Sequence, residues 1–303
     1  MKKTNLNICF TFALLLISAV SFLGCEKDIT VDFPPAPDLI VVEGHIEPGQ
    51  YAYVHLTKNS SYFAPTDTAT LLSYVIGNAT VLVSDGVDYD TLKFTIDFHN
   101  FPYFPFVYKG SKIIGQANHF YTLKVMANGQ TVTSYTSIPT PVKPDSAWFR
   151  VQGNLDSLGF VWIHFKDPDT TGNCYRFMTK RISHRPDGSV KDIDFLTNIN
   201  SVFDDKIFNG TSPDFSFNRG HVPHDTAMDS HNVEAGFFKK GDTIIFKYMN
   251  IDRPHFDFWS TEGIAAESSG NPFAAPIMVK SNIVGGLGIW GGYGAAYDTV
   301  IAK

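Results

Sequence analysis

The sequence predicts a mainly β protein, and three observations support this fold class. Short apolar stretches of strand length recur along the chain and are separated by Gly, Asn, Asp and Pro. Aromatic residues make up 14% of the chain, and strands favour such side chains. Only one stretch, residues 253–268, carries apolar residues at helical spacing. We therefore expect an all-β architecture with one short helix.

Strand patterning begins at about residue 38. Apolar or alternating stretches that favour strands cover residues 39–46, 51–56, 79–83, 121–126 and 131–135. The last two flank Asn128-Gly129, and this pair is typical of a tight hairpin turn because both of its residues need a positive φ. Strands at this spacing predict an immunoglobulin-like β-sandwich over residues 38–138.

A proline-rich stretch, residues 139–144, interrupts regular structure, since proline cannot donate to a sheet. We place a domain boundary here. Strand patterning resumes beyond it, whereas residues 184–241 are polar and rich in Gly, Asn and Asp, which predicts long loops. Residues 145–303 are therefore expected to form a β-rich C-terminal domain that contains the helix.

The first 24 residues have the pattern of a secretory signal peptide. Lys2 and Lys3 precede a short apolar run, and Gly24 precedes Cys25. The apolar run is shorter than the ~20 residues that a membrane-spanning helix needs. The end of this segment resembles a bacterial lipoprotein signal, which implies that Cys25 becomes the first mature residue and carries lipid such as palmitate. The alternative is an ordinary secreted protein with an incidental cysteine.

Residues 25–37 read as a tether. An acidic cluster at residues 26–28 resembles the export signal of surface lipoproteins, although a solvated linker is an equally good interpretation. The prolines that follow make the segment extended and semi-rigid. We expect a protein that is anchored to the lipid of the outer membrane through Cys25 and faces the cell exterior.

Charge and cysteine content exclude some classes of partner and bond. The net charge is −6, and loss of Lys2 and Lys3 with the signal peptide makes the mature chain −8. An acidic chain without a basic run is not suited to nucleic acid. Cys9 leaves with the signal and Cys25 is lipidated, so Cys174 remains alone and forms no intrachain disulfide. We expect it to be a small buried residue of a strand.

Near the C-terminus, Gly286, Gly288 and Gly291 spell G-x-G-x-x-G, the pattern of a dinucleotide-binding turn. Such a turn must open a helix and be followed by an acidic residue about 20 positions later, yet only 12 residues follow Gly291. We therefore expect no nucleotide cofactor, nor any other cofactor. The glycines are predicted to allow close backbone approach or tight turns in a terminal β-hairpin.

The same region, Ser281-Asn282-Ile283 followed by residues 285–291, resembles the C-terminal signature of an uncharacterised lipoprotein family of Bacteroidota. Residues 39–46, 78–81, 121–125 and 271–273 carry the same resemblance. The resemblance implies a partner, a TonB-dependent β-barrel receptor, because genes of this family often lie beside the genes for such receptors. It implies an accessory role in nutrient capture or transport, and no catalytic residues.

Three groups of residues are candidates for a site. His221, His224 and His231 could ligate zinc and support a metal-dependent hydrolase, but a solvated loop is the preferred interpretation, so no metal site is expected. Asp192, Asp194, Asp204 and Asp205 are the nearest acidic pairs for acid–base chemistry, and we expect them to be solvated loop residues.

The third group is an aromatic run, in which Pro102 and Pro105 argue against a central strand. Aromatic surfaces anchor ligands and partners, although a buried plug between sheets is the preferred alternative. The residues of this candidate surface are Phe101, Tyr103, Phe104, Phe106 and Tyr108. The expected function is binding without catalysis, and a structural or adhesive surface protein is the alternative.

Overall fold

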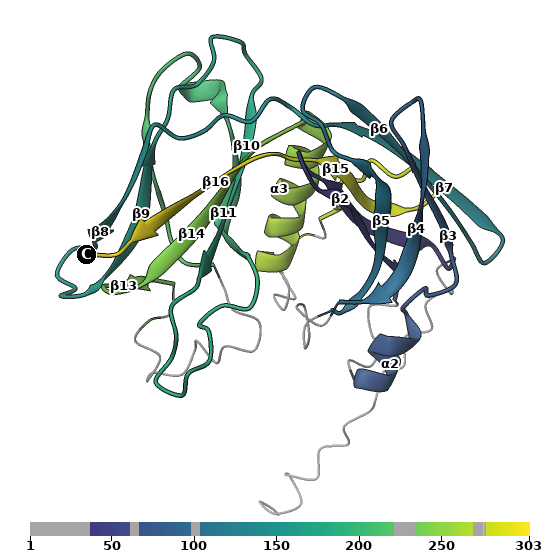
Figure 1. Cartoon of the computed structure of the whole chain (residues 1–303), viewed down its shortest axis with the longest axis horizontal. Helices are drawn as coiled ribbons and strands as arrows, with labels where there is room; N and C mark the ends of the chain where they lie inside the picture. Colours follow the sequence, from purple (N-terminus) through teal and green to yellow (C-terminus); the bar gives the residue numbers. More distant parts are fainter. Residues whose placement is uncertain are drawn as a thin grey trace, which may run out of the picture. The chain divides into compact units, whose positions relative to one another are not determined.

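One large sheet contains the strands of residues 40–137 together with a strand from the far end of the chain (Figure 1). The structure is a computed structural model, and it describes residues 37–60, 67–97, 104–220, 234, 236–268, 275 and 277–303. The order of the strands is β15-β1-β2-β5-β4-β3-β6-β7. They are β1 (Ile40–Ile46), β2 (Tyr51–Lys58), β3 (Thr80–Ser84), β4 (Tyr89–Ile96), β5 (Phe106–Ile114), β6 (Phe120–Ala127), β7 (Gln130–Ser137) and β15 (Leu287–Gly292).

Alternating side chains build the core of this first sheet. Along β2, every second residue from Ala52 to Leu56 is buried, as expected for a strand with one face toward the core. The turn between β6 and β7 contains Asn128 and Gly129, whose φ angles are 52° and 74°. Both angles are positive, so the hairpin predicted from the Asn-Gly pair is confirmed.

The two edges of the first sheet come together. Beside β15, Val284 exchanges backbone hydrogen bonds of 3.1 and 2.8 Å with Thr133 of β7. The backbone N–H of Gly292 donates to Thr136 Oγ1 at 2.8 Å. The sheet is therefore a nearly closed barrel, with Trp290 fully buried in its core. The prediction of a mainly β protein is confirmed, whereas this strand order does not confirm an immunoglobulin-like sandwich.

Two further sheets lie beyond residue 145. One has the order β11-β10-β14-β16, and in the other β9 pairs with β8, β12 and β13. Aromatic rings from both sheets and from the loops beside them pack into one buried core. The elements are β8 (Ser146–Val151), β9 (Leu158–His164), β10 (Cys174–Arg181), β11 (Leu196–Asp204), the 3-10 helix η1 (Asp205–Ile207), β12 (Asp214–Phe217), β13 (Phe238–Lys239), β14 (Thr243–Ile251) and β16 (Gly294–Ile301).

Helix α3 (Arg253–Ser268) covers the residues that the apolar spacing predicts. The Asp252 carboxylate accepts a hydrogen bond from the backbone N–H of His255 at 3.0 Å, as an N-cap does. The helix contacts β10, β11 and β15, so it lies between the first sheet and the β11-β10-β14-β16 sheet (Figure 1). The short helix α2 (Thr68–Ser73), which Asp67 caps, was not expected from the sequence.

The last two strands join the first sheet to the second. β15 pairs in parallel with β1, whereas β16 pairs antiparallel with β14, and only Tyr293 separates them. The predicted terminal hairpin is therefore wrong, because these strands belong to different sheets. The predicted close approach is confirmed: Gly288 has a φ of +105°, and a Cβ there would lie 1.9 Å from Val42 O.

Strand β5 is central, contrary to the expectation drawn from its prolines. It begins at Phe106, directly after Pro105, and pairs with β2 and β4. Because a proline lacks only its own N–H, Pro105 leaves the strand that follows it intact. The Pro105 carbonyl instead accepts a hydrogen bond from Asp97 N at 2.7 Å.

Candidate functional site

Six of the residues that the sequence singles out lie outside the described residues. These are Cys25, His221, His224, His231, Phe101 and Tyr103. Within the described part of the chain, no cluster of three or more His, Cys, Asp or Glu could hold a metal ion. Among the same residues, no helix is long and apolar enough to cross a membrane.

The rest of the aromatic run divides between the core and the surface. Tyr108 is buried, and its hydroxyl donates to Ile76 O at 2.9 Å and accepts from Ala79 N at 2.8 Å. Its ring therefore belongs to the core and is not available to a ligand. Phe104 and Phe106 are half-buried beside His55, whose Nδ1 lies 2.7 Å from Phe106 O. They lie next to a recess that His55 helps to line.

This recess, of about 500 Å³, lies where the first sheet meets the β11-β10-β14-β16 sheet and α3. Side chains of the outer face of the barrel form one wall, because positions 43 and 45 of β1 alternate with the buried residues Val42 and Ile46. The opposite wall comes from β10, β11, β14 and α3. The residues on which the site depends are Glu43, His45, Tyr53, Arg176, Asp194, Phe195, Thr197, Lys247, Trp259 and Tyr293.

Arg176 is the most buried cation of the recess, with 3% of its surface exposed. On β10 its neighbours Tyr175 and Phe177 point into the aromatic core, so Arg176 lies on the opposite face, toward α3. Its Nη1 donates to Tyr293 Oη at 2.7 Å and its Nη2 to Thr197 Oγ1 at 3.4 Å. The guanidinium carbon lies 3.6 Å from the centre of the Trp259 ring, in a stacked cation–π contact.

Lys247, on the neighbouring strand β14, is the second cation of the recess. It forms a buried ion pair with Glu47, which also accepts a hydrogen bond from Tyr297 Oη at 2.6 Å. Burial alone would raise the pKa of Glu47, but Lys247, His45 and Tyr297 outweigh burial and lower it. Glu47 is therefore an anion that neutralises Lys247 within the protein.

His45 contributes a neutral imidazole to the recess. Its pKa is lowered to about 4, chiefly by burial and further by the positive charges of Lys247 and Arg176, against the opposing effect of Glu47. The ring stacks on Tyr53, with 5.9 Å between the ring centres. At neutral pH it can donate one hydrogen bond and accept another.

A family model described as a domain of unknown function, DUF4249, matches residues 26–298. The chain belongs to this family. The match includes both parts of the fold and every residue of the recess described above. No curated protein matches the chain.

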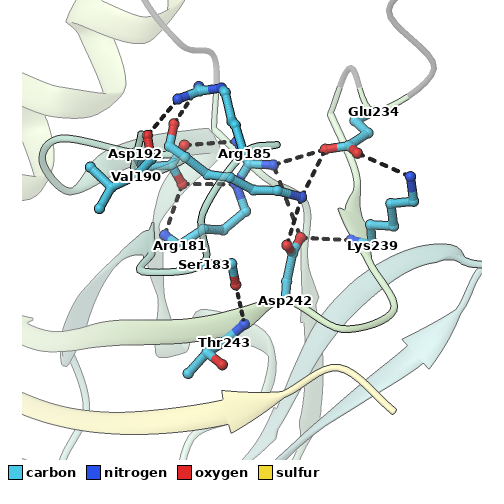
Figure 2. A network of polar contacts seen from close by, with 10 residues as sticks. Arg181, Ser183, Arg185, Val190, Asp192, Glu234, Lys239, Asp242 and Thr243 are labelled. Atoms are coloured by element: carbon cyan, nitrogen blue, oxygen red, sulfur yellow. Dashed lines mark hydrogen bonds and ion pairs between the residues drawn. The ribbon is translucent and has the colours of Figure 1, made fainter. Parts of the chain in front are cut away.

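A second hollow, of about 530 Å³, lies beside the loop 182–191 and is rich in cations. Figure 2 shows that Arg181 and Lys239 lie beside the carboxylates of Asp192, Glu234 and Asp242. Arg181 binds both oxygens of Asp192, at 2.9 and 2.8 Å, and contacts Glu234 at 3.2 Å. Lys191 binds Asp242 at 2.8 Å. Because acids on neighbouring segments balance the charges of Arg181 and Lys191, we interpret the network as a clasp that holds the loop in place.

The expectation that the acidic pairs are solvated is wrong for two of the four aspartates. Asp192 and Asp205 are buried and are not solvated loop acids. Asp192 pairs with Arg181, and Asp205 accepts the backbone N–H groups of Gly172 and Asn173 at 3.0 and 2.9 Å. Both carboxylates hold loops in place, so neither is free for acid–base chemistry.

No motif in the sequence predicts the residues of the recess, although the chain carries a sign of them. Arg176 interrupts the apolar stretch Cys174–Met178, and Lys247 interrupts Ile244–Met249. A cation in a strand with two buried faces must have a partner, because an isolated buried charge is costly. Such an interruption therefore marks a site even where no known motif is present.

Proposed function

We propose that the protein is a binding protein without catalytic activity, held at the outer membrane by lipid on Cys25 and facing the cell exterior. The single observation that supports binding is the recess of about 500 Å³ at the junction of two sheets and a helix. Small-molecule sites favour such junctions, and they combine aromatic walls with a few directed polar groups. Aromatic walls and directed polar groups are both present, in Trp259, Tyr293, Arg176 and His45.

The proposed partner is a TonB-dependent β-barrel receptor, for which the protein would gather a nutrient. This part of the proposal rests on the resemblance of the sequence to lipoproteins of Bacteroidota. A tether between Cys25 and the first strand at Ile40 would confine the recess near the membrane. Confinement raises the effective concentration of a captured ligand at the receptor without any new contact.

Anchoring is tested with cells that express the wild type, Cys25→Ala or Cys174→Ala. We expect an alkyne analogue of palmitate to label the wild type and Cys174→Ala, and Cys25→Ala to be unlabelled and released from the membrane. Cys174→Ala is the matched control because that thiol is buried in the fold. Release of neither variant, with no label on the wild type, would contradict lipid anchoring.

Orientation and partner need two further measurements on the same cells. A membrane-impermeant amine reagent should label the wild type on intact cells, and protection from it would place the protein on the periplasmic side. Crosslinking of intact cells should capture a β-barrel receptor with the wild type and not with Cys25→Ala. Repeated absence of such a receptor would contradict the accessory role.

A further inference from the structure

Arg176 is a buried cation, and among the described residues no carboxylate forms a hydrogen bond or an ion pair with it; Glu262 acts on it only through space. A guanidinium offers five N–H groups, and two of them have acceptors, both of them neutral hydroxyls. The Nε atom is buried without an acceptor. Since buried charges in proteins are normally paired, the partner of this charge is expected to come from a bound molecule.

Lys247 provides an internal comparison. Arg176 pairs with Met249 and Met178 pairs with Lys247 across β10 and β14, so both cations lie on the same face of the sheet. Lys247 is 8% exposed and has Glu47 as its carboxylate. The fold therefore supplies an anion for one of the two cations of the recess and leaves the other to bind an anion from outside.

The surroundings of Arg176 suit one kind of anion. A guanidinium binds a carboxylate through two parallel hydrogen bonds, and the stacked ring of Trp259 restricts the plane in which these bonds can form. Tyr53, Phe195 and Tyr293 add ring surface for a flat or apolar body.

The rim of the recess limits the charge of the ligand. Glu43 and Asp194 line the recess and are exposed. Their negative charges repel a second anionic group on a bound molecule. A polyanion such as a sulfated glycan is therefore disfavoured.

We propose that the recess binds a small molecule through a single carboxylate, which Arg176 receives, with the flat or apolar body of that molecule against the aromatic walls. The inference rests on the proposed binding function and names its class of ligand.

The test is a calorimetric titration of the mature chain carrying Cys25→Ala. The probes are 3-phenylpropanoate, its neutral amide 3-phenylpropanamide, and benzylmalonate, which carries a second carboxylate. We expect 3-phenylpropanoate to bind at least about tenfold more tightly than the amide, since the amide cannot pair with a buried cation. Benzylmalonate should bind more weakly than the monocarboxylate because of the acidic rim.

Two variants assign the binding to Arg176. Arg176→Gln should weaken binding of 3-phenylpropanoate about 30-fold or more. Arg150→Gln is the matched control, because Arg150 of β8 lies over the ring of Trp162 of β9, outside the recess. This variant should leave binding unchanged. The unfolding midpoint of Arg176→Gln should stay within about 5 °C of the wild type, since no internal ion pair is lost.

The outcomes distinguish the carboxylate inference from the proposed binding function of the recess. Equal binding of the acid and the amide would overturn the carboxylate inference and leave the recess as a binding site. Absence of binding by every probe at about 10 mM would overturn the inference and the use of the recess, whereas the labelling and crosslinking experiments judge anchoring and partner separately. If Arg176→Gln does not fold, the comparison of acid with amide on the wild type still decides.

Discussion

The imidazole of His255 lies against the backbone of Gly291, so that a Cβ at position 291 would be 1.3 Å from His255 Cε1. His255 is fully buried at the start of α3, and its ring stacks on Tyr293 with 4.9 Å between centres. Helix α3 can therefore pack on β15 only because residue 291 has no side chain. This contact helps to hold Trp259, on the same helix, at the recess.

Replacing Gly291 by alanine is expected to destabilise the protein by about 3 kcal/mol or more, since the new methyl group overlaps a buried ring. The free energy of unfolding in denaturant measures this. Gly263→Ala in α3 is the matched control, because no atom lies within 4 Å of a Cβ there, and alanine is favoured in a helix by about 1 kcal/mol. Equal free energies of unfolding for the two variants would contradict the close contact between His255 and Gly291.

The ion pair of Arg181 with Asp192 is expected to contribute strongly to stability. The two side chains are 3% and 1% exposed, so Asp192→Asn leaves a buried guanidinium short of charge and should cost about 3 kcal/mol. The comparison is Asp88→Asn, which breaks an exposed pair with Lys112, and it should cost less than about 1 kcal/mol. Similar unfolding midpoints for both variants in urea would contradict the clasp.

Cys174 should react slowly with thiol reagents in the folded protein. Burial raises its pKa from 9.0 to about 11, which outweighs the lowering by Arg253. At pH 8 the thiolate fraction is then about 100-fold below that of an ordinary thiol, and the buried sulfur is also shielded. We expect labelling of the Cys25→Ala chain by iodoacetamide to be slow in buffer and fast in denaturant. Fast labelling in buffer would show that β10 opens easily.

Stability should fall as the pH falls from about 6.5 to about 4. The pKa of His45 is lowered to about 4 by burial, so in this range the unfolded chain binds a proton that the folded chain does not. Above about pH 6.5 neither state binds this proton, and the free energy of unfolding keeps its full value. Between about pH 6.5 and about pH 4 it falls progressively. Unfolding free energies at several pH values should fall less steeply for His45→Gln than for the wild type. Parallel curves would show that His45 is freely solvated.

Local features of the fold could be predicted from the sequence because their causes are local. The hairpin at Asn128-Gly129 follows from two adjacent residues that accept positive φ. The limits of α3 follow from apolar spacing, whereas its cap at Asp252 is seen only in the structure. The burial of Cys174 follows from its place in an apolar stretch.

Features that depend on distant contacts could not be predicted. Glu47 and Lys247 are 200 residues apart, and no pattern within either stretch names the other as its partner. The burial of Asp192 could not be predicted for a related reason. This residue follows a polar loop, and its partner Arg181 lies within a strand. The recess is formed by residues from both halves of the described chain, from β1 to the link between β15 and β16, so its existence depends on the tertiary fold.

The position of β1 bears on how the chain is made. β1 has two neighbours: β2, which follows it directly, and β15, which begins at Leu287. During synthesis one side of β1 must wait until residues 287–292 have emerged, and such distant pairing is slow. A chain that stops before β15 leaves the edge of β1 open, where another chain can pair with it and aggregate. Strand β15 thus decides whether a newly made molecule becomes protected from its neighbours.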